Sequence, residues 1–136
     1  MINKLILKIN LFVFFLIFFT TIDAAEGGPC KDYGECDKFK YSLNDIMGSV
    51  EKDDHPPSDF SPELSALWYT KKGNWDKAHD IVSEINTSMA SWIHAHLHVI
   101  EGDLGNAAYW YNRSKRDPIS PDQLDKEWVL LVESNL

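Results

Sequence analysis

The segment "GDLGNAAYWY" (residues 102–111) decides the fold, because it has a counterpart 29 residues earlier in the chain. The earlier segment, "GNWDKAHDIV" (residues 73–82), shares a glycine, a following polar residue, a large apolar residue and, after two spacers, an alanine. The agreement continues upstream, since Ala66 and Ala95 each stand seven residues before the glycine of their segment. The chain therefore contains an internal repeat of two units.

Each unit predicts two helices joined at its glycine. Gly73 and Gly102 stand where a helix commonly ends in a left-handed residue. Asn74 and Asp103 follow them directly, and each can cap the next helix through its side-chain oxygen. Because a single helical hairpin cannot bury its apolar face alone, we expect the two hairpins to stack on each other.

Helix-start signals flank the repeat on both sides. Ser61 and Pro62 open a helix with a capping hydroxyl and a proline at the first turn, and Ser120 with Gln123 forms a potential capping box. Upstream, apolar residues at helical spacing predict a short helix over about residues 39–50. The charged, proline-containing segment between the short helix and Ser61 predicts a loop. The sequence thus predicts an all-α bundle whose final helix caps the hairpins.

The repeat resembles the tetratricopeptide motif over about residues 62–116. The matching positions are Gly73, Asn74, Trp75 and Ala78 in the first unit, and Gly102, Asp103, Leu104 and Ala107 in the second. Its period is shorter than the motif's usual length of about 34 residues, and two units are fewer than the roughly three that such arrays need. The resemblance therefore implies a small closed bundle with a groove for a protein or peptide partner.

A longer string also looks like a group of small bacterial helical proteins with no assigned activity. The string consists of Trp92, His94, Ala95, Leu97, His98, Glu101, Gly102, Asp103, Asn106, Ala107, Tyr109, Trp110, Tyr111 and Arg113. This second resemblance implies a recurring structural unit and brings no reaction with it.

The N-terminus has the pattern of a secretory signal peptide. Lysines precede the apolar run of residues 11–19, and small residues follow it at Ala24 and Ala25. Lys8 and Asn10 interrupt any longer apolar stretch, so an uncleaved membrane anchor is the less favoured alternative. We expect a signal peptide over residues 1–24, a cysteine-containing segment with the short helix and the loop over 25–60, and a repeat domain over 61–134. A secreted or periplasmic location follows.

Export and charge limit the chemistry of the chain. Cys30 and Cys36 are its two cysteines, and in an oxidising compartment we expect them to form a disulfide. The net charge of −8 argues against a nucleic-acid partner, which needs a basic surface. No phosphate loop, nucleophile elbow or serine triad is visible, so the sequence predicts neither an enzyme nor a cofactor.

The histidines of "SWIHAHLHVIEGD" (residues 91–103) suggest one exception, a zinc site. At about 100° per residue, His94, His98 and Glu101 share one stripe of a helix, while His96 falls in the apolar arc. His79 from the preceding helix is a possible fourth ligand. The other interpretation, which we favour at this stage, is that the histidines serve packing, because His94 and His98 occupy positions that are packed in the repeat motif.

Aromatic residues provide the candidate anchors for a partner. Tyr109, Trp110 and Tyr111 are consecutive on a helix and cannot all enter one core, so Tyr109 or Trp110 is a candidate anchor unless the flanking helices cover both. Trp75, which opens the second helix of the first unit, is the third candidate. Our leading hypothesis from sequence is an exported protein-protein interaction or scaffold module. The alternative is a metal-binding protein that uses a stripe of histidine and glutamate on one helix.

Overall fold

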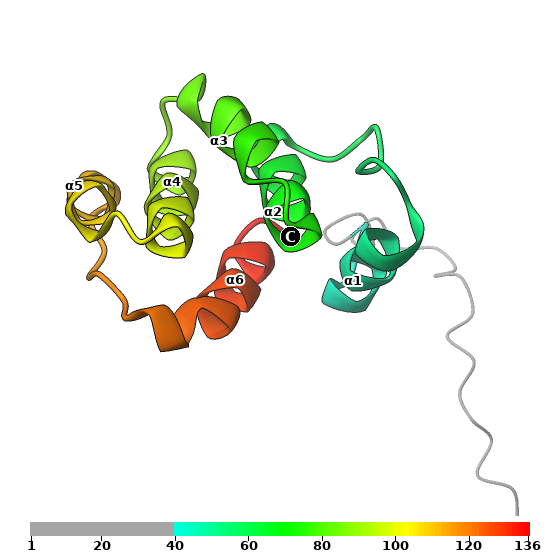
Figure 1. The fold of residues 1–136 in the computed structure, drawn as a ribbon. Helices are drawn as coiled ribbons and strands as arrows, with labels where there is room; N and C mark the ends of the chain where they lie inside the picture. The colour runs from blue at the N-terminus through cyan, green and yellow to red at the C-terminus, as the bar shows by residue number, and fades with distance from the viewer. Residues whose placement is uncertain (1–39) are drawn as a thin grey trace, which may run out of the picture. The chain divides into compact units, whose positions relative to one another are not determined.

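A computed structural model describes residues 40–136, and all of its regular structure is helical. The elements are α1 (Leu43–Lys52), α2 (Pro62–Lys72), α3 (Trp75–Ser83), α4 (Ser88–Glu101), α5 (Leu104–Ser114), the short 3-10 helix η2 (Pro121–Gln123) and α6 (Leu124–Glu133) (Figure 1). No strand occurs among these described residues, so the all-α prediction is confirmed. The expected signal peptide (residues 1–24) and the expected disulfide between Cys30 and Cys36 lie outside them.

The helices of the repeat begin and end at the predicted caps. Gly73 and Gly102 end α2 and α4 in the left-handed conformation, with φ angles of 80° and 88°. Asn74 accepts a hydrogen bond from a backbone N–H of the first turn of α3, and Asp103 does the same for α5. Ser61 likewise caps α2 through its hydroxyl. These contacts satisfy N–H groups that a helix leaves unpaired at its start.

The first helix differs from its predicted range of about 39–50. It spans Leu43–Lys52, because Ser42 caps it in a reciprocal capping box with Asp45. The spacing of apolar residues placed the helix but did not reveal this cap. At the other end of the chain, the predicted box of Ser120 and Gln123 is present, and it opens the 3-10 turn that leads into α6.

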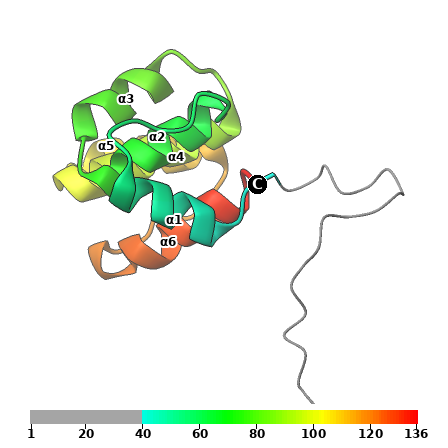
Figure 2. The same cartoon turned by 90° about the vertical axis from the view of Figure 1, so that its right-hand side faces the viewer.

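Helix α4 lies at the centre of the bundle. It packs against α2, α3, α5 and α6, and α6 in turn contacts α2, the first helix of the other hairpin. Helix α1 completes the bundle by packing against α2 and α6, as Figure 2 shows. The repeat alanines Ala66, Ala78, Ala95 and Ala107 are all buried where helices approach each other.

Ten consecutive residues of α4, from Ala90 to Val99, are buried. A helix with one solvent face would expose some of them, so this helix is enclosed on every side. Three of the ten are histidines, which the surrounding helices must provide with polar partners. No helix within residues 40–136 has both the length and the apolar character needed to cross a membrane.

The left-handed glycine that ends α4 gives a stability test. A Cβ at Gly102 would meet no atom within 4 Å, so Gly102→Ala costs only the backbone strain of a positive φ, about 1 kcal/mol. Gly48 is the matched control, because it lies inside α1 with equal space around it. Gly48→Ala should raise the free energy of unfolding by about 0.5–1 kcal/mol. Urea denaturation measures both changes, and equal signs would contradict this account.

Candidate metal centre

Three histidines from two helices converge between the hairpins. His94 and His98 lie one turn apart on α4, and His79 reaches them from α3. A nitrogen of each of these rings lies within 4.8 Å of the other two. His94 and His98 are only 4% and 5% exposed, and His79 is half-buried. We call these three residues the histidine cluster.

The spacing within the histidine cluster is close to that of metal ligands. The Nε2 atoms of His79 and His94 are 3.0 Å apart. Two imidazole nitrogens bound tetrahedrally to zinc at about 2.0–2.1 Å would stand roughly 3.3 Å apart. A metal ion therefore needs only a small adjustment of this pair, together with an inward movement of the third ring.

The ring of His98 is oriented as in a metal ligand. Its Nδ1 lies 2.9 Å from Oε2 of Glu101 and donates its proton there, which leaves Nε2 as the nitrogen with the lone pair. Nε2 is buried and has no hydrogen-bond partner among residues 40–136, and the same is true of Nδ1 of His94. A histidine whose outer N–H is held by a carboxylate is the usual arrangement around zinc.

Burial keeps His94 in the form that a metal needs. It lowers the pKa of His94 to about 4, with further contributions from repulsion by His79 and His98. The ring is therefore neutral at neutral pH, so protons compete little for its lone pair.

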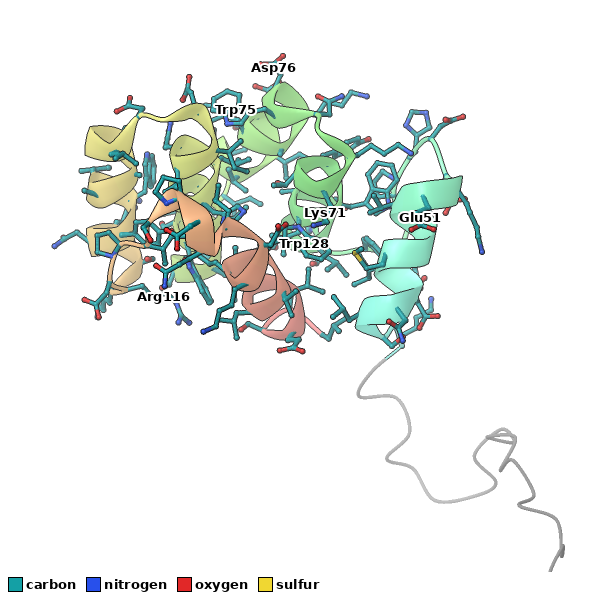
Figure 3. All side chains as sticks on the ribbon, turned by 60° about the horizontal axis from the view of Figure 1, so that its bottom comes forward. Glu51, Lys71, Trp75, Asp76, Arg116 and Trp128 are labelled. Atoms are coloured by element: carbon teal, nitrogen blue, oxygen red, sulfur yellow. The ribbon has the colours of Figure 1, made fainter. Side chains whose placement is uncertain are left out.

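Two tryptophans enclose the histidine cluster. Trp75 stacks on His79, with ring centroids 4.5 Å apart, and Trp110 stacks on His94 at 3.8 Å. Trp75, labelled in Figure 3, is fixed by a 2.8 Å hydrogen bond from its indole to the carbonyl of Leu97. Two of the three predicted partner anchors thus lie against histidines.

The remaining sequence-predicted residues, Glu101 and Tyr109, are not members of the histidine cluster. Glu101 contacts the outer side of His98 through Nδ1 and is not among the converging ligand atoms. Tyr109, the third predicted partner anchor, is 58% exposed on α5. The described part of the chain thus brings together His79, His94 and His98 and leaves Glu101 in a supporting place.

His96 belongs to a different polar group, which sequence reasoning missed. It donates through Nδ1 to the buried carboxylate of Glu127 on α6, at 2.8 Å. The same carboxylate accepts from the indole of Trp92 and the hydroxyl of Tyr111, each at 2.7 Å. We call these four residues the Glu127 network. The sequence offered one signal for this network, because Glu127 is an acid that directly precedes Trp128 on the apolar side of the last helix.

The donors of the Glu127 network decide its charge. Burial alone would raise the pKa of Glu127, but the hydrogen bonds from His96, Trp92 and Tyr111 outweigh it and hold the pKa below its ordinary value. Burial raises the pKa of Tyr111, so its hydroxyl stays a donor. The carboxylate is therefore ionised and fully engaged at neutral pH.

Comparison with known proteins adds no assignment to either polar group. The chain matches no protein-family model, no curated protein and no solved structure. The function must therefore be inferred from the residues themselves.

The Glu127 network predicts a pH-dependent stability. Glu127→Gln replaces an acceptor oxygen by a donor that faces other donors, so we expect a loss of about 2–4 kcal/mol in the free energy of unfolding. Because the folded pKa lies below 4.5, the stabilisation is present above that pH and is lost as the pH falls through the folded value.

Denaturation at pH 7 and at pH 3 measures both effects. The variant should show a smaller difference between the two conditions than the native chain. Glu133→Gln, which alters an exposed acid on the same helix, is the control and should change little. Equal losses in the two variants would show that burial of Glu127 has no special role.

Proposed function

We propose that this chain is an exported metal-binding protein whose His79, His94 and His98 hold a zinc ion or another transition ion that prefers imidazole. One observation carries the proposal. A buried nitrogen of His98, left without a partner by the bond to Glu101, lies beside two other imidazoles in a space of ligand dimensions. Leaving a polar atom buried and unpaired costs about 1–3 kcal/mol, and a metal ion removes that cost.

The packing interpretation explains these histidines less well. A structural histidine uses both ring nitrogens, as a buried polar group normally must. His98 leaves Nε2 unpaired among the described residues, and Nε2 is the nitrogen that remains free to bind a metal once Nδ1 is held by Glu101. Three imidazoles, with no thiolate beside them among residues 40–136, form a ligand set that suits zinc, copper, nickel or iron, and zinc takes three histidines with one position left for water.

Metal binding would also act on the fold. His79 belongs to the α2–α3 hairpin, whereas His94 and His98 belong to the α4–α5 hairpin. One ion would thus cross-link the two units of the repeat. Because the folded chain offers the assembled site and the unfolded chain does not, the ion would raise the free energy of unfolding.

The partner-binding module predicted from the repeat is the second candidate. Tyr109 supports it, because this large aromatic side chain is exposed on α5. Trp75 and Trp110 support it less, since both stack on histidines. The two functions are compatible, because Tyr109 is not one of the three candidate metal ligands.

Zinc titration tests the metal proposal. Calorimetry on the metal-free chain should give a dissociation constant of about 1 μM or tighter, with one ion per chain. His94→Gln and His98→Gln should each weaken binding by about a hundredfold or more, because each removes one of three ligands. His55→Gln, at an exposed histidine in the loop before α2, is the control. Absent binding, or equal affinity in all variants, would contradict the proposal.

Glu101 requires a separate variant, because it distinguishes a positioning residue from a ligand. If the carboxylate only orients His98, Glu101→Gln should weaken zinc binding by about tenfold to a hundredfold and leave Co²⁺ absorption bands unchanged in shape. A loss as large as that of His98→Gln, with an altered Co²⁺ spectrum, would instead make Glu101 the third or fourth ligand.

A further inference from the structure

A pocket of about 400 Å³ lies between α4, α6 and the segment that joins α5 to α6. Three cations surround it, namely Lys115, Arg116 and Lys126, and its apolar wall is formed by Trp92, Ile119 and Leu130. None of these residues belongs to the histidine cluster. Figure 3 shows Arg116 well separated from Trp75, which marks that cluster. We call this hollow the cationic pocket.

Arg116 is held in place without an anionic partner. Its guanidinium carbon lies 3.4 Å from the ring centroid of Trp92, so the charged group lies over the indole ring. Trp92 is itself fixed by its hydrogen bond to Glu127. The guanidinium forms no ion pair and donates no hydrogen bond to any residue within 40–136, so the edge that recognises a carboxylate in two-point fashion is available.

The charge of the cationic pocket is opposite to that of the chain. The chain carries a net charge of −8, yet neither Lys115 nor Lys126 pairs with an acid in the described region. Glu127 also lines the pocket, but its carboxylate already accepts from three donors. Asp117 is then the one other acid among the lining residues, so the cations exceed the free acids.

The apolar wall narrows the class of ligand. Leu130 is 46% exposed and Ile119 is half-buried, and both border the same hollow as the cations. A purely inorganic anion would leave this apolar surface in contact with water. A short apolar group attached to the anion would cover it, and the volume is within the range of small-molecule sites.

We propose that the cationic pocket binds a carboxylate that carries a short apolar body. Arg116 takes the carboxylate in two-point fashion, Lys115 and Lys126 add charge, and Ile119, Leu130 and the Trp92 edge contact the apolar part. Both a free organic acid and the C-terminal residue of a peptide present this chemistry. The site shares no residue with the proposed metal centre, which uses His79 of α3 and His94 and His98 of α4.

Titrations of the full chain, followed by two-dimensional NMR of the tryptophan indole groups, test this proposal. N-acetyl-leucine should bind with a millimolar or tighter dissociation constant and shift the indole resonance of Trp92. N-acetyl-leucinamide, its neutral match, should bind at least about tenfold more weakly, because it lacks the charge-assisted hydrogen bonds. Inorganic phosphate should be weaker by a similar factor, since it lacks the apolar part.

Variants locate the site, and a second acid identifies the source. Arg116→Gln and Lys126→Gln should each weaken binding of N-acetyl-leucine, the former by about tenfold or more. Lys52→Gln, at the end of α1, is the control and should bind normally. Hexanoate that binds as well as N-acetyl-leucine indicates a free acid as ligand, whereas preference for N-acetyl-leucine and for peptides that end in leucine indicates a peptide terminus.

Three results would overturn the proposal. They are equal binding of the amide, no shift at Trp92, and unchanged affinity in both pocket variants. The titrations are repeated with a chelator present, and we expect the same affinity. Failure of the metal proposal and failure of this one are thus observed separately.

Discussion

The burial of residues 90–99 of α4 forces the three histidines of this helix to find polar partners within the protein. An imidazole cannot lose its contact with water without a hydrogen bond or a metal ion in return. Each ring obtains its partner from a different direction. His96 is paired with Glu127 of α6, His98 with Glu101 at the end of its own helix, and His94 with His79 of α3. Two of these contacts tie α4 to a neighbouring helix, to α6 through Glu127 and to α3 through His79.

This constraint divides α4 into two chemically different sides. On the side that faces α6, His96 and Trp92 have hydrogen-bond partners, because the ionised carboxylate of Glu127 accepts from both of them and from Tyr111. Towards α3 and α5, three imidazoles meet with no acid between them, and two of their nitrogens remain unpaired within residues 40–136. The side that faces α6, whose polar groups are paired, stabilises the fold. The side with the unpaired Nε2 of His98 is suited to an ion, and for that reason we place the proposed function there.

Local features of the fold could be predicted from sequence because they depend on neighbouring residues. Gly73 and Gly102 ended helices as expected, and helical periodicity placed His94 and His98 on one side of α4 and His96 on another. The partners of those rings could not be predicted, because Glu127 lies 31 residues from His96 and the choice depends on how the helices pack. The stacking of Trp75 and Trp110 on histidines could not be predicted for the same reason, and the sequence offered both residues only as candidate partner anchors. The likeness to tetratricopeptide repeats stays a prediction.

The most direct measurement of the central claim is the X-ray absorption spectrum of the zinc-loaded chain at the metal edge. Our account predicts nitrogen or oxygen neighbours at about 2.0–2.1 Å, with the outer-shell scattering of three imidazole rings. A shell of sulfur at about 2.3 Å, which would implicate Cys30 and Cys36, would contradict it. So would a spectrum with scattering from fewer than three rings.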